Sequence, residues 1–404
     1  MKILIADSFD ESGVETLRSE SFDITHQPGL TATDLPDAMK ALDPDIVVVR
    51  STRITAEAID SGLNLSLIIR AGAGYDTIDL DRASAKGVFV ANCPGKNALA
   101  VAELAWGLIL ACDRRIPDQT ADLRDGSWKK KEYGKSSGLA GRTIGVIGAG
   151  RIGRAVIRRA RAFDMKVATW DRSLTEEEAR TMELTHCESL VNLAKMSDVV
   201  TVHLPSVPAT KHLINDRFID SMRPGAILIN TSRGALVDEK ALRRGIEEKG
   251  LRAGLDVYED EPSSGIAEFA NDLISLPGVY GTHHVGASTD QAQESIANEV
   301  VRIILSYRNS GEVPNCVNRA SAGRSAALLT VRHMNKPGVL AKVFDILGQA
   351  ALNVEEMENL IYEGGESACA RIQLGKTPSI GEVKAIEEEE TVLGVSVASI
   401  ESKD

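Results

Sequence analysis

Residues 143–153 read TIGVIGAGRIG. The apolar start of this run predicts a buried strand, and its end predicts the first turn of a helix. The turn between them carries Gly148, Gly150 and Gly153. Glycines at this spacing let the backbone approach a pyrophosphate, whose negative charge then meets the N-terminus of the helix. We therefore expect a strand–turn–helix unit that binds a dinucleotide.

Asp171 lies at the end of the next expected strand, 166–170. A carboxylate in that place accepts hydrogen bonds from the ribose hydroxyls of the adenosine and repels a 2′-phosphate. The site is therefore expected to prefer NAD to NADP, and the neighbouring Arg172 weakens that preference slightly.

Short, wholly apolar runs continue the pattern on both sides of this unit. Such runs are typical of strands buried on both faces of a parallel sheet, and helical stretches alternate with them. The sequence therefore predicts an α/β fold with two doubly wound parallel sheets. The expected strands of the first sheet are 2–7, 46–49, 67–69 and 88–90, and the further strands of the second are 199–203, 226–230 and 253–257.

The chain has 404 residues and a formal net charge of −12, from 46 basic and 58 acidic residues. This length favours two or three domains. The acidic balance argues against a generally basic surface, so neither nucleic acid nor a membrane is an expected partner. An anionic substrate would need a local cluster of cations. The five cysteines lack CxxC spacing, which favours reduced thiols, no metal site and a cytoplasmic protein.

Residues 97–112 predict a helix that is apolar on nearly every face. A helix without a polar face must be buried, either in a core or against another subunit. In the chain, this helix lies between the segments that form the two expected sheets. This place favours the second alternative, a subunit interface.

Three loops follow expected strands of the second sheet. They read NTSRG at 230–234, DVYEDEP at 256–262 and HHVGAST at 283–289. Strand ends are where open α/β sheets bind their ligands. An arginine there can clamp a carboxylate, and a histidine can take a hydroxyl proton while a carboxylate fixes its tautomer. This combination suits the oxidation of a 2-hydroxy acid to a 2-oxo acid.

Together with GAGRIG and Asp171, these loops resemble the D-isomer-specific 2-hydroxyacid dehydrogenases over residues 1–308. The resemblance implies that Arg233 orients the substrate carboxylate, that Glu261 supports the histidine and that His284 is the general base. The residues that it assigns to NAD are Gly148, Gly150, Arg151, Ile152, Gly153, Asp171, Leu204, Ser232, Arg233, Asp256, His284, Gly286 and Ala287.

The same resemblance implies two Rossmann-like domains with the active site in the cleft between them. Closure of the hinge over bound cofactor would then exclude water from hydride transfer. The implied parts are a discontinuous substrate-binding domain at 1–95 and 286–308, an NAD-binding domain at 96–285, a linker at 309–325 and a C-terminal domain at 326–404.

Two loops of the first sheet, VRSTR at 49–53 and IRAGAGYD at 69–76, resemble the substrate-side loops of family members that act on 3-phosphoglycerate. The resemblance implies that backbone amides around 70–74 face the substrate carboxylate and that Arg50, with Arg53 as a weaker candidate, holds a phosphate. The implied substrate-binding residues are Arg50, Ser51, Arg70, Ala71, Gly72 and Ala73, and the further cations expected near them are Arg53 and Lys96. The lysines at 129–131 are expected either to reach the cleft of a neighbouring subunit or to lie on the solvated surface.

The remaining residues, 326–404, predict the element order β-α-β-β-α-β of a ferredoxin-like module. RHMNKPGVL at 332–340 and LNV at 352–354 resemble the ACT regulatory domain, which pairs edge to edge and binds small amino acids. The resemblance implies a homodimer or homotetramer and an effector, L-serine. The residues that it assigns to the effector are His333, Asn335 and Asn353.

As a whole, the resemblance implies NAD-dependent oxidation of 3-phospho-D-glycerate to 3-phosphohydroxypyruvate, the first step of L-serine synthesis, under the control of serine. Two alternatives stay open. One is another 2-hydroxyacid dehydrogenase of the glyoxylate or hydroxypyruvate reductase type. The other is a non-catalytic sensor of NAD or of an amino acid, against which Arg233, Glu261 and His284 argue.

Overall fold

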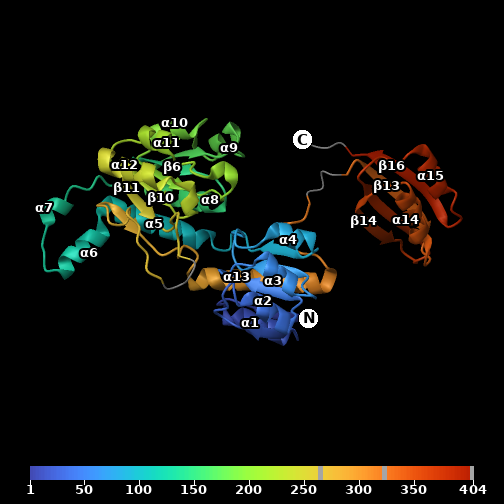
Figure 1. Cartoon of the computed structure of the whole chain (residues 1–404). Helices are drawn as coiled ribbons and strands as arrows, with labels where there is room; N and C mark the ends of the chain where they lie inside the picture. Colours follow the sequence, from blue (N-terminus) through green and yellow to red (C-terminus); the bar gives the residue numbers. More distant parts are fainter. Residues whose placement is uncertain (263–266, 321–324, 401–404) are drawn as a thin grey trace. The chain divides into compact units, whose positions relative to one another are not determined.

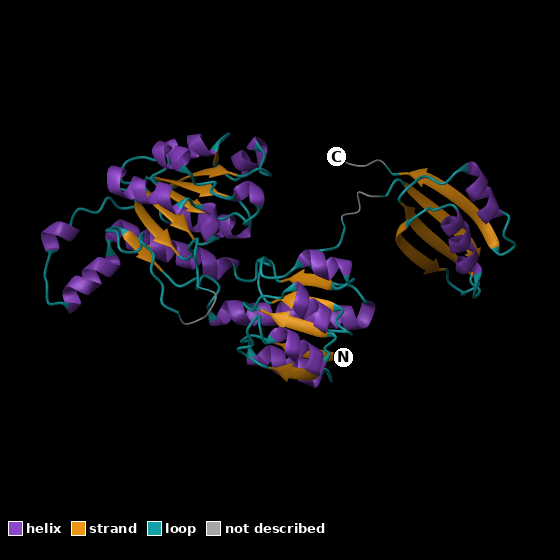
Figure 2. Cartoon of the chain, in the orientation of Figure 1, coloured by secondary structure: helices purple, strands orange, loops and turns teal. Residues whose placement is uncertain are grey.

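The computed structural model describes residues 1–262, 267–320 and 325–400. By its internal contacts the chain divides into two compact units, Met1–Asn318 and Arg319–Asp404. The first unit holds two parallel sheets and the second holds one antiparallel sheet, as Figure 2 shows. The predicted fold class, an α/β protein with two doubly wound sheets and a small ferredoxin-like module, is confirmed.

The first sheet contains β1 (Lys2–Ile5), β2 (Asp23–His26), β3 (Ile46–Val49), β4 (Leu67–Arg70) and β5 (Phe89–Asn92). Its strands run parallel in the order β2-β1-β3-β4-β5. Apolar side chains line both faces, so each face needs a layer of helices. One face packs against α1 (Glu11–Ser19) and α13 (Asp290–Ser310), and the other against α2 (Leu35–Leu42), α3 (Ala56–Ser61) and α4 (Leu80–Ala85).

The second sheet contains β6 (Thr143–Ile147), β7 (Lys166–Trp170), β8 (Thr185–His186), β9 (Val199–Val202), β10 (Ile227–Asn230), β11 (Arg252–Leu255) and β12 (Val279–Gly281). Its order is β12-β11-β10-β9-β6-β7-β8, and all pairs are parallel. The order reverses between β6 and β9, which is where a doubly wound sheet opens a crevice for a dinucleotide.

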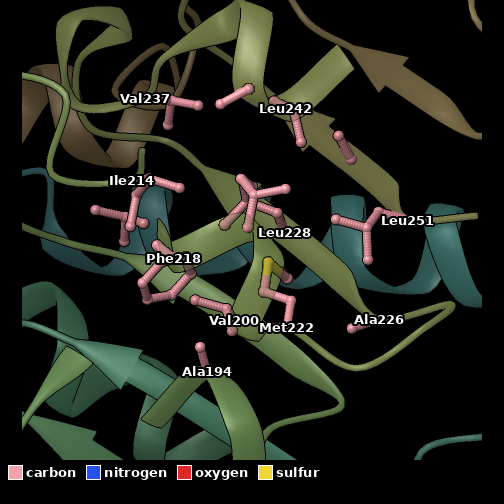
Figure 3. Packing of buried hydrophobic residues seen from close by; sticks show 14 of the residues in the cluster. Ala194, Val200, Ile214, Phe218, Met222, Ala226, Leu228, Val237, Leu242 and Leu251 are labelled. Atoms are coloured by element: carbon pink, nitrogen blue, oxygen red, sulfur yellow. The ribbon is translucent and has the colours of Figure 1, made fainter. Parts of the chain in front are cut away.

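Helices cover both faces of this second sheet (Figure 1). One face packs against α5 (Ala98–Arg114), α8 (Arg151–Ala162) and α9 (Glu176–Thr181). The other packs against α10 (Leu190–Met196), α11 (Asp216–Ser221) and α12 (Glu239–Lys249). Figure 3 shows this second layer, in which Phe218 and Met222 meet Val200 and Leu228 of the strands. Short 3-10 turns, Pro208–Thr210 and Gly234–Leu236, precede α11 and α12.

The apolar helix α5 is buried by its own chain. Trp106, Ile109 and Cys112 belong to the core between the sheet and α8, and the Trp106 ring stacks on Phe163 at 4.5 Å between centroids. A sheet face and a neighbouring helix thus cover most of the apolar surface of α5, whereas Leu99 stays exposed, and the subunit interface stays a prediction. Two short helices follow it at the periphery of the unit, α6 (Ile116–Arg124) and α7 (Lys130–Tyr133), and neither has a buried residue (Figure 1).

After α13 the chain returns along the edge of the first sheet. Cys316 forms an antiparallel bridge with Ala91 of β5. The Asn318 side chain accepts a hydrogen bond from the Val90 N–H at 2.9 Å and donates one to the Val88 carbonyl at 2.9 Å. We call residues 313–318 the strap. The expectation of a linker that begins at 309 is thus corrected, because these residues are bonded to strand β5.

The second unit is a four-stranded antiparallel sheet in the order β14-β15-β13-β16. Its elements are β13 (Ala327–Met334), α14 (Val339–Gln349), β14 (Val354–Ile361), β15 (Ser367–Leu374), α15 (Ile380–Glu387) and β16 (Val392–Ser399). Both helices pack on one face of the sheet around Leu329, Val343 and Ile372. The order β-α-β-β-α-β is the one that the sequence predicts.

Within residues 1–262, 267–320 and 325–400, no helix has the length and apolar character needed to cross a membrane. In the same described residues, no group of three or more histidine, cysteine, aspartate or glutamate side chains is arranged to hold a metal ion.

Candidate active site

The predicted catalytic residues lie at one edge of the second sheet. Arg233 follows β10, Asp256 follows β11 and His284 follows β12. These neighbouring strands run parallel, so their carboxyl ends share an edge, and residues distant in sequence meet there.

His284 and Glu261 form a close polar pair at this edge. The Nδ1 of His284 lies 2.6 Å from the Oε2 of Glu261, and the Tyr258 N–H donates to Oε1 at 2.9 Å. Burial raises the pKa of Glu261, but the hydrogen bonds from His284 and Tyr258 outweigh it, so the net pKa lies below its ordinary value. An ionised carboxylate holds the proton on Nδ1 and leaves Nε2 of His284 free to accept one.

Asp256 holds the loop that carries His284. This fully buried carboxylate accepts hydrogen bonds from the Thr282 hydroxyl at 2.5 Å and from the Val285 and Gly286 N–H groups at 2.9 Å each. His284 itself has a φ of 53°, in the left-handed region, so its backbone needs such support. Both Asp256 oxygens thereby hold this loop, and its contact with NAD stays a prediction.

Arg233 meets a residue that the sequence did not single out. Its Nε and Nη2 donate to the two carboxylate oxygens of Asp76 at 3.4 and 3.2 Å, and its Nη1 donates to the Ser232 carbonyl at 2.8 Å. Burial raises the pKa of Asp76, but the Arg233 guanidinium brings it below its ordinary value. Asp76 belongs to the loop after β4, so this ion pair joins the edges of the two sheets.

Three guanidinium groups gather at this junction. Arg70 is largely buried, and its Nε has no hydrogen-bond partner within the described part of the chain. Burial, and next the charges of Arg233 and Arg50, lower the pKa of Arg70 to about 10. The Nη2 of Arg50 donates to the Ser288 hydroxyl at 3.1 Å. A buried donor without a partner, among like charges, indicates a site for an anion.

The loop that carries Arg50 is fixed from below by Asp7. One oxygen of Asp7 accepts the N–H groups of Arg50, Ser51 and Thr52 at 2.7, 3.1 and 3.1 Å. The Ser51 amide is therefore engaged within the chain. This role could not be inferred from the sequence, because Asp7 follows β1 and its partners follow β3.

Two of the backbone amides expected to face the substrate are also engaged. The Ala71 N–H donates to the Val49 carbonyl at 2.7 Å, and the Gly72 N–H donates to the Arg70 carbonyl at 2.8 Å. That expectation is corrected for Ala71 and Gly72, because strand pairing and a tight turn use their donors. Ala73 instead accepts a hydrogen bond at its carbonyl from the Asn92 side chain, at 2.6 Å.

Not every expected cation belongs to this cluster. Lys96 pairs with the buried Glu299 at 3.1 Å, and Lys129 pairs with Asp122 at 2.9 Å. Arg53, Lys130 and Lys131 are exposed. Lys96 and Lys129 are thus paired with carboxylates, and their contribution to a substrate site stays a prediction.

The glycine-rich turn has the close packing that a dinucleotide site requires. A Cβ on Gly148 would overlap the His203 carbonyl oxygen, and one on Gly153 would overlap the carbonyl oxygen of Gly148. Gly148 has a φ of 94°, which only glycine adopts readily. The turn leads directly into α8, so its helix N-terminus is available to a pyrophosphate. Arg151, at the start of α8, donates to the Pro94 carbonyl.

Asp171 lies at the end of β7, beside this turn. One oxygen accepts the Ala149 N–H at 2.7 Å, and the other accepts the Ser173 N–H and hydroxyl at 2.8 and 2.6 Å. Burial raises its pKa, but these hydrogen bonds bring it below the ordinary value, so the group is ionised. Leu204 borders Gly148, and Ile152 is half-buried in the first turn of α8. These residues fit an NAD with a free 2′-hydroxyl.

The three predicted effector residues have separate surroundings in the second unit. His333 is buried, and its ring nitrogens contact the Met334 carbonyl at 2.9 Å and the Asn359 side chain at 3.1 Å. Asn335 donates to the Gly365 carbonyl, and Asn353 donates to Glu355, both from exposed positions. The hydrogen bonds of His333 are thus made within its own unit.

The chain belongs to the D-isomer-specific 2-hydroxyacid dehydrogenases, a family of NAD-binding enzymes. The model of its NAD binding domain matches residues 106–286. The hydroxypyruvate reductase of Thermotoga maritima is 39% identical over 308 residues, which cover 75% of this chain and 97% of that protein. The D-3-phosphoglycerate dehydrogenase of Methanocaldococcus jannaschii is 39% identical over 320 residues, which cover 79% of this chain and 59% of that protein. The match therefore spans about three fifths of this second relative.

Solved structures of the family share the fold of the first unit. The NAD-bound 3-phosphoglycerate dehydrogenase of Entamoeba histolytica has a TM-score of 0.67 and 26% identity, over 80% of this chain and 99% of that one. The NADPH-dependent glyoxylate/hydroxypyruvate reductase of Sinorhizobium meliloti has a TM-score of 0.68 and 29% identity, over 78% and 96%. The predicted enzyme class and nicotinamide cofactor are thus confirmed.

Proposed function

We propose that this chain oxidises 3-phospho-D-glycerate to 3-phosphohydroxypyruvate with NAD, the first step of L-serine synthesis. The observation that carries the proposal is the cluster of Arg50, Arg70 and Arg233, in which the buried Arg70 Nε has no partner within the described residues. A phosphoglycerate has an anionic group at each end, and two separate cation sites would bind both. Glycerate would use only one of them.

The proposed mechanism assigns the carboxylate end to Arg233. Its guanidinium orients the substrate so that the C2 hydroxyl faces Nε2 of His284. His284 takes the hydroxyl proton while the hydride leaves C2, and Glu261 stabilises the imidazolium that forms. NAD supplies the hydride acceptor when it is bound. The hydroxyl carbon becomes the carbonyl of the 2-oxo acid, so protons and electrons balance.

The phosphate end is assigned to Arg50, with Arg70 between the two ends. Asp7 fixes the backbone of the Arg50 loop, so the guanidinium extends from a rigid base. A cation held by the fold loses less entropy on binding an anion than a free surface side chain does.

The proposal also assigns a role to each part of the chain. The first sheet with α13 would bind the substrate, and the second sheet would bind NAD, with hinge closure between them. The second unit would act as an ACT regulatory domain, at which L-serine binds near His333, Asn335 and Asn353 and which pairs two copies of the chain. Its element order and its size support this assignment.

A reductase of hydroxypyruvate or glyoxylate is the second candidate. The Thermotoga maritima relative that bears such a name is as similar in sequence as the Methanocaldococcus jannaschii relative. Such an enzyme needs Arg233, Glu261 and His284 but has no use for a phosphate site. The number of cations that the substrate requires therefore separates the two functions.

The test is NAD reduction with 3-phosphoglycerate and with D-glycerate, each with and without L-serine, and the reverse reaction with hydroxypyruvate and glyoxylate. Arg50→Ala should raise the KM for 3-phosphoglycerate about a hundredfold and leave that for glycerate within a few fold, because one charge-assisted contact is worth about 2–3 kcal/mol. Arg53→Ala, on the same loop, tests the weaker candidate for the phosphate in the same assay. Equal effects of Arg50→Ala on both substrates would refute the phosphate site.

A further inference from the structure

Asp76 and Arg233 come from different sheets and meet at the candidate active site. Asp76 lies in the loop after β4, and Arg233 lies in the loop after β10, 157 residues away. Both oxygens of the carboxylate are used, one by Nε and one by Nη2. A Cβ on Gly74 would overlap Nη2 of Arg233, so this glycine makes room for the approach.

The hydrogen bonds of Arg233 leave a defined pair of donors. A guanidinium has five N–H groups. Asp76 takes one on Nε and one on Nη2, and the Ser232 carbonyl takes one on Nη1. Among the described residues, one N–H on Nη1 and one on Nη2 have no partner, so two donors are available to a carboxylate.

We propose that Asp76 is a positioning residue for this dehydrogenase, which holds Arg233 so that these two donors face the substrate carboxylate. The inference rests on the proposed role of Arg233 and adds a residue to it. Asp76 also ties the loop of one sheet to the loop of the other, so Arg233 is oriented only when the two edges are together.

The ion pair is poorly placed to serve stability. The Asp76 side chain is 57% exposed and that of Arg233 is 29% exposed. Exposed pairs of this kind contribute little to the free energy of folding. If the ion pair has a structural role, removal of Asp76 should change the melting temperature. If it has a positioning role, removal of Asp76 should change substrate binding and leave the melting temperature unchanged.

A purely electrostatic role of Asp76 and a positioning role predict opposite changes in substrate binding when Asp76 is removed. A carboxylate beside an anionic substrate repels it, so its removal should strengthen binding if Asp76 does nothing else. If Asp76 orients Arg233, its removal frees the guanidinium to adopt other rotamers, and binding weakens. The direction of the change in KM thus distinguishes the two.

The experiment compares Asp76→Asn and Asp76→Ala with Asp81→Asn, an exposed carboxylate in the first turn of α4. We expect Asp76→Ala to raise the KM for 3-phosphoglycerate about tenfold and to lower kcat, because both donors lose their partner. The KM and kcat of Asp76→Asn should lie between those of Asp76→Ala and those of the wild type. The KM for NAD, the affinity for NADH by fluorescence and the melting temperature should stay at the wild-type values.

A second pair of variants tests whether the effect passes through Arg233. In an Arg233→Lys background, Asp76→Ala should change the KM much less than it does in the wild type. The reason is that the effects of substitutions at two contacting residues do not add. Calorimetric titration of 3-phosphoglycerate into the NADH complex supplies a binding readout that needs no turnover.

The outcomes separate this inference from the proposed function. A lower or unchanged KM in Asp76→Ala, beside an impaired Arg233→Lys, overturns the positioning role and leaves the function standing. A wild-type protein that neither binds nor oxidises a 2-hydroxy acid overturns the proposed function first. A fall in melting temperature that accounts for the loss of binding overturns the positioning role as well.

Discussion

His284 can take a proton from a hydroxyl only at Nε2, because Glu261 engages Nδ1 at 2.6 Å. The sequence placed these two residues in separate motifs, and parallel strands β11 and β12 bring the motifs together. The loop around them depends on Asp256, whose contacts fix the backbone after His284. The loops at the ends of β11 and β12 thus determine how the His284 ring is oriented.

Replacement of either member should slow the chemical step. We expect His284→Gln to lower kcat by roughly 10²–10⁴, the usual contribution of a general base, and Glu261→Gln to lower it less. The affinity for NADH, measured by fluorescence titration, should change little in both. A kcat in His284→Gln close to that of the wild type would contradict the assignment of the base.

Glu299 is a buried carboxylate that should make the stability of the protein depend on pH. Arg302 first of all, together with Lys96 and Asn315, lowers the pKa of this buried carboxyl to about 2. Its folded pKa lies below the unfolded value of about 4.3, so its contribution to stability is present above pH ~4.3 and is lost as pH falls toward 2.

Glu299→Gln should therefore lower the free energy of unfolding by roughly 1–3 kcal/mol at pH 7, as expected when a buried ion loses its partner. The difference from the wild type should shrink as pH falls from about 4.3 to about 2. Urea unfolding at several pH values measures it. The exposed Glu294→Gln, on the same helix, is the control and should show no such convergence.

At the scale of elements, the glycine-rich turn shows why each glycine is needed. Gly153 faces the Gly148 carbonyl across the turn, whereas Gly107 of α5 faces open space. Gly153→Ala should therefore force the turn apart, which should weaken NADH binding at least tenfold and lower the melting temperature. Gly107→Ala should bind normally and be up to about 1 kcal/mol more stable, because alanine is the better helix former. Normal NADH binding by Gly153→Ala would contradict this account.

The strands were largely predictable from the sequence, whereas the contacts between residues remote in sequence were not. Apolar runs of four or five residues predicted β3, β6 and β9 within a residue, because buried parallel strands have no polar face. The strap was misread, since its polar residues bond to a strand more than 200 positions earlier and show no periodicity. Asp7, Asp76 and Glu299 were missed for the same reason: each acts through a partner remote in sequence.

At the scale of the whole molecule, the first unit ends at Asn318 and includes the strap. The Thermotoga maritima relative matches over 308 residues, 97% of its length, so a protein of about this size exists in the family. A chain of residues 1–318 should therefore fold and bind NADH. A chain of residues 1–312 loses the Asn315 and Asn318 hydrogen bonds and should melt several degrees lower, at about 0.5–1.5 kcal/mol for each bond. Equal melting temperatures, measured by calorimetry, would contradict a structural role for the strap.

The gathering of Arg50, Arg70 and Arg233 also bears on how the protein is handled at the bench. Inorganic phosphate and sulfate have the charge and the oxygen geometry of the phosphate group that we propose this edge binds. Rates recorded in phosphate buffer should therefore fall below those recorded in a zwitterionic amine buffer at the same ionic strength. A crystal grown from ammonium sulfate should hold a sulfate ion at the proposed substrate site, beside the Arg70 Nε that has no partner among the described residues.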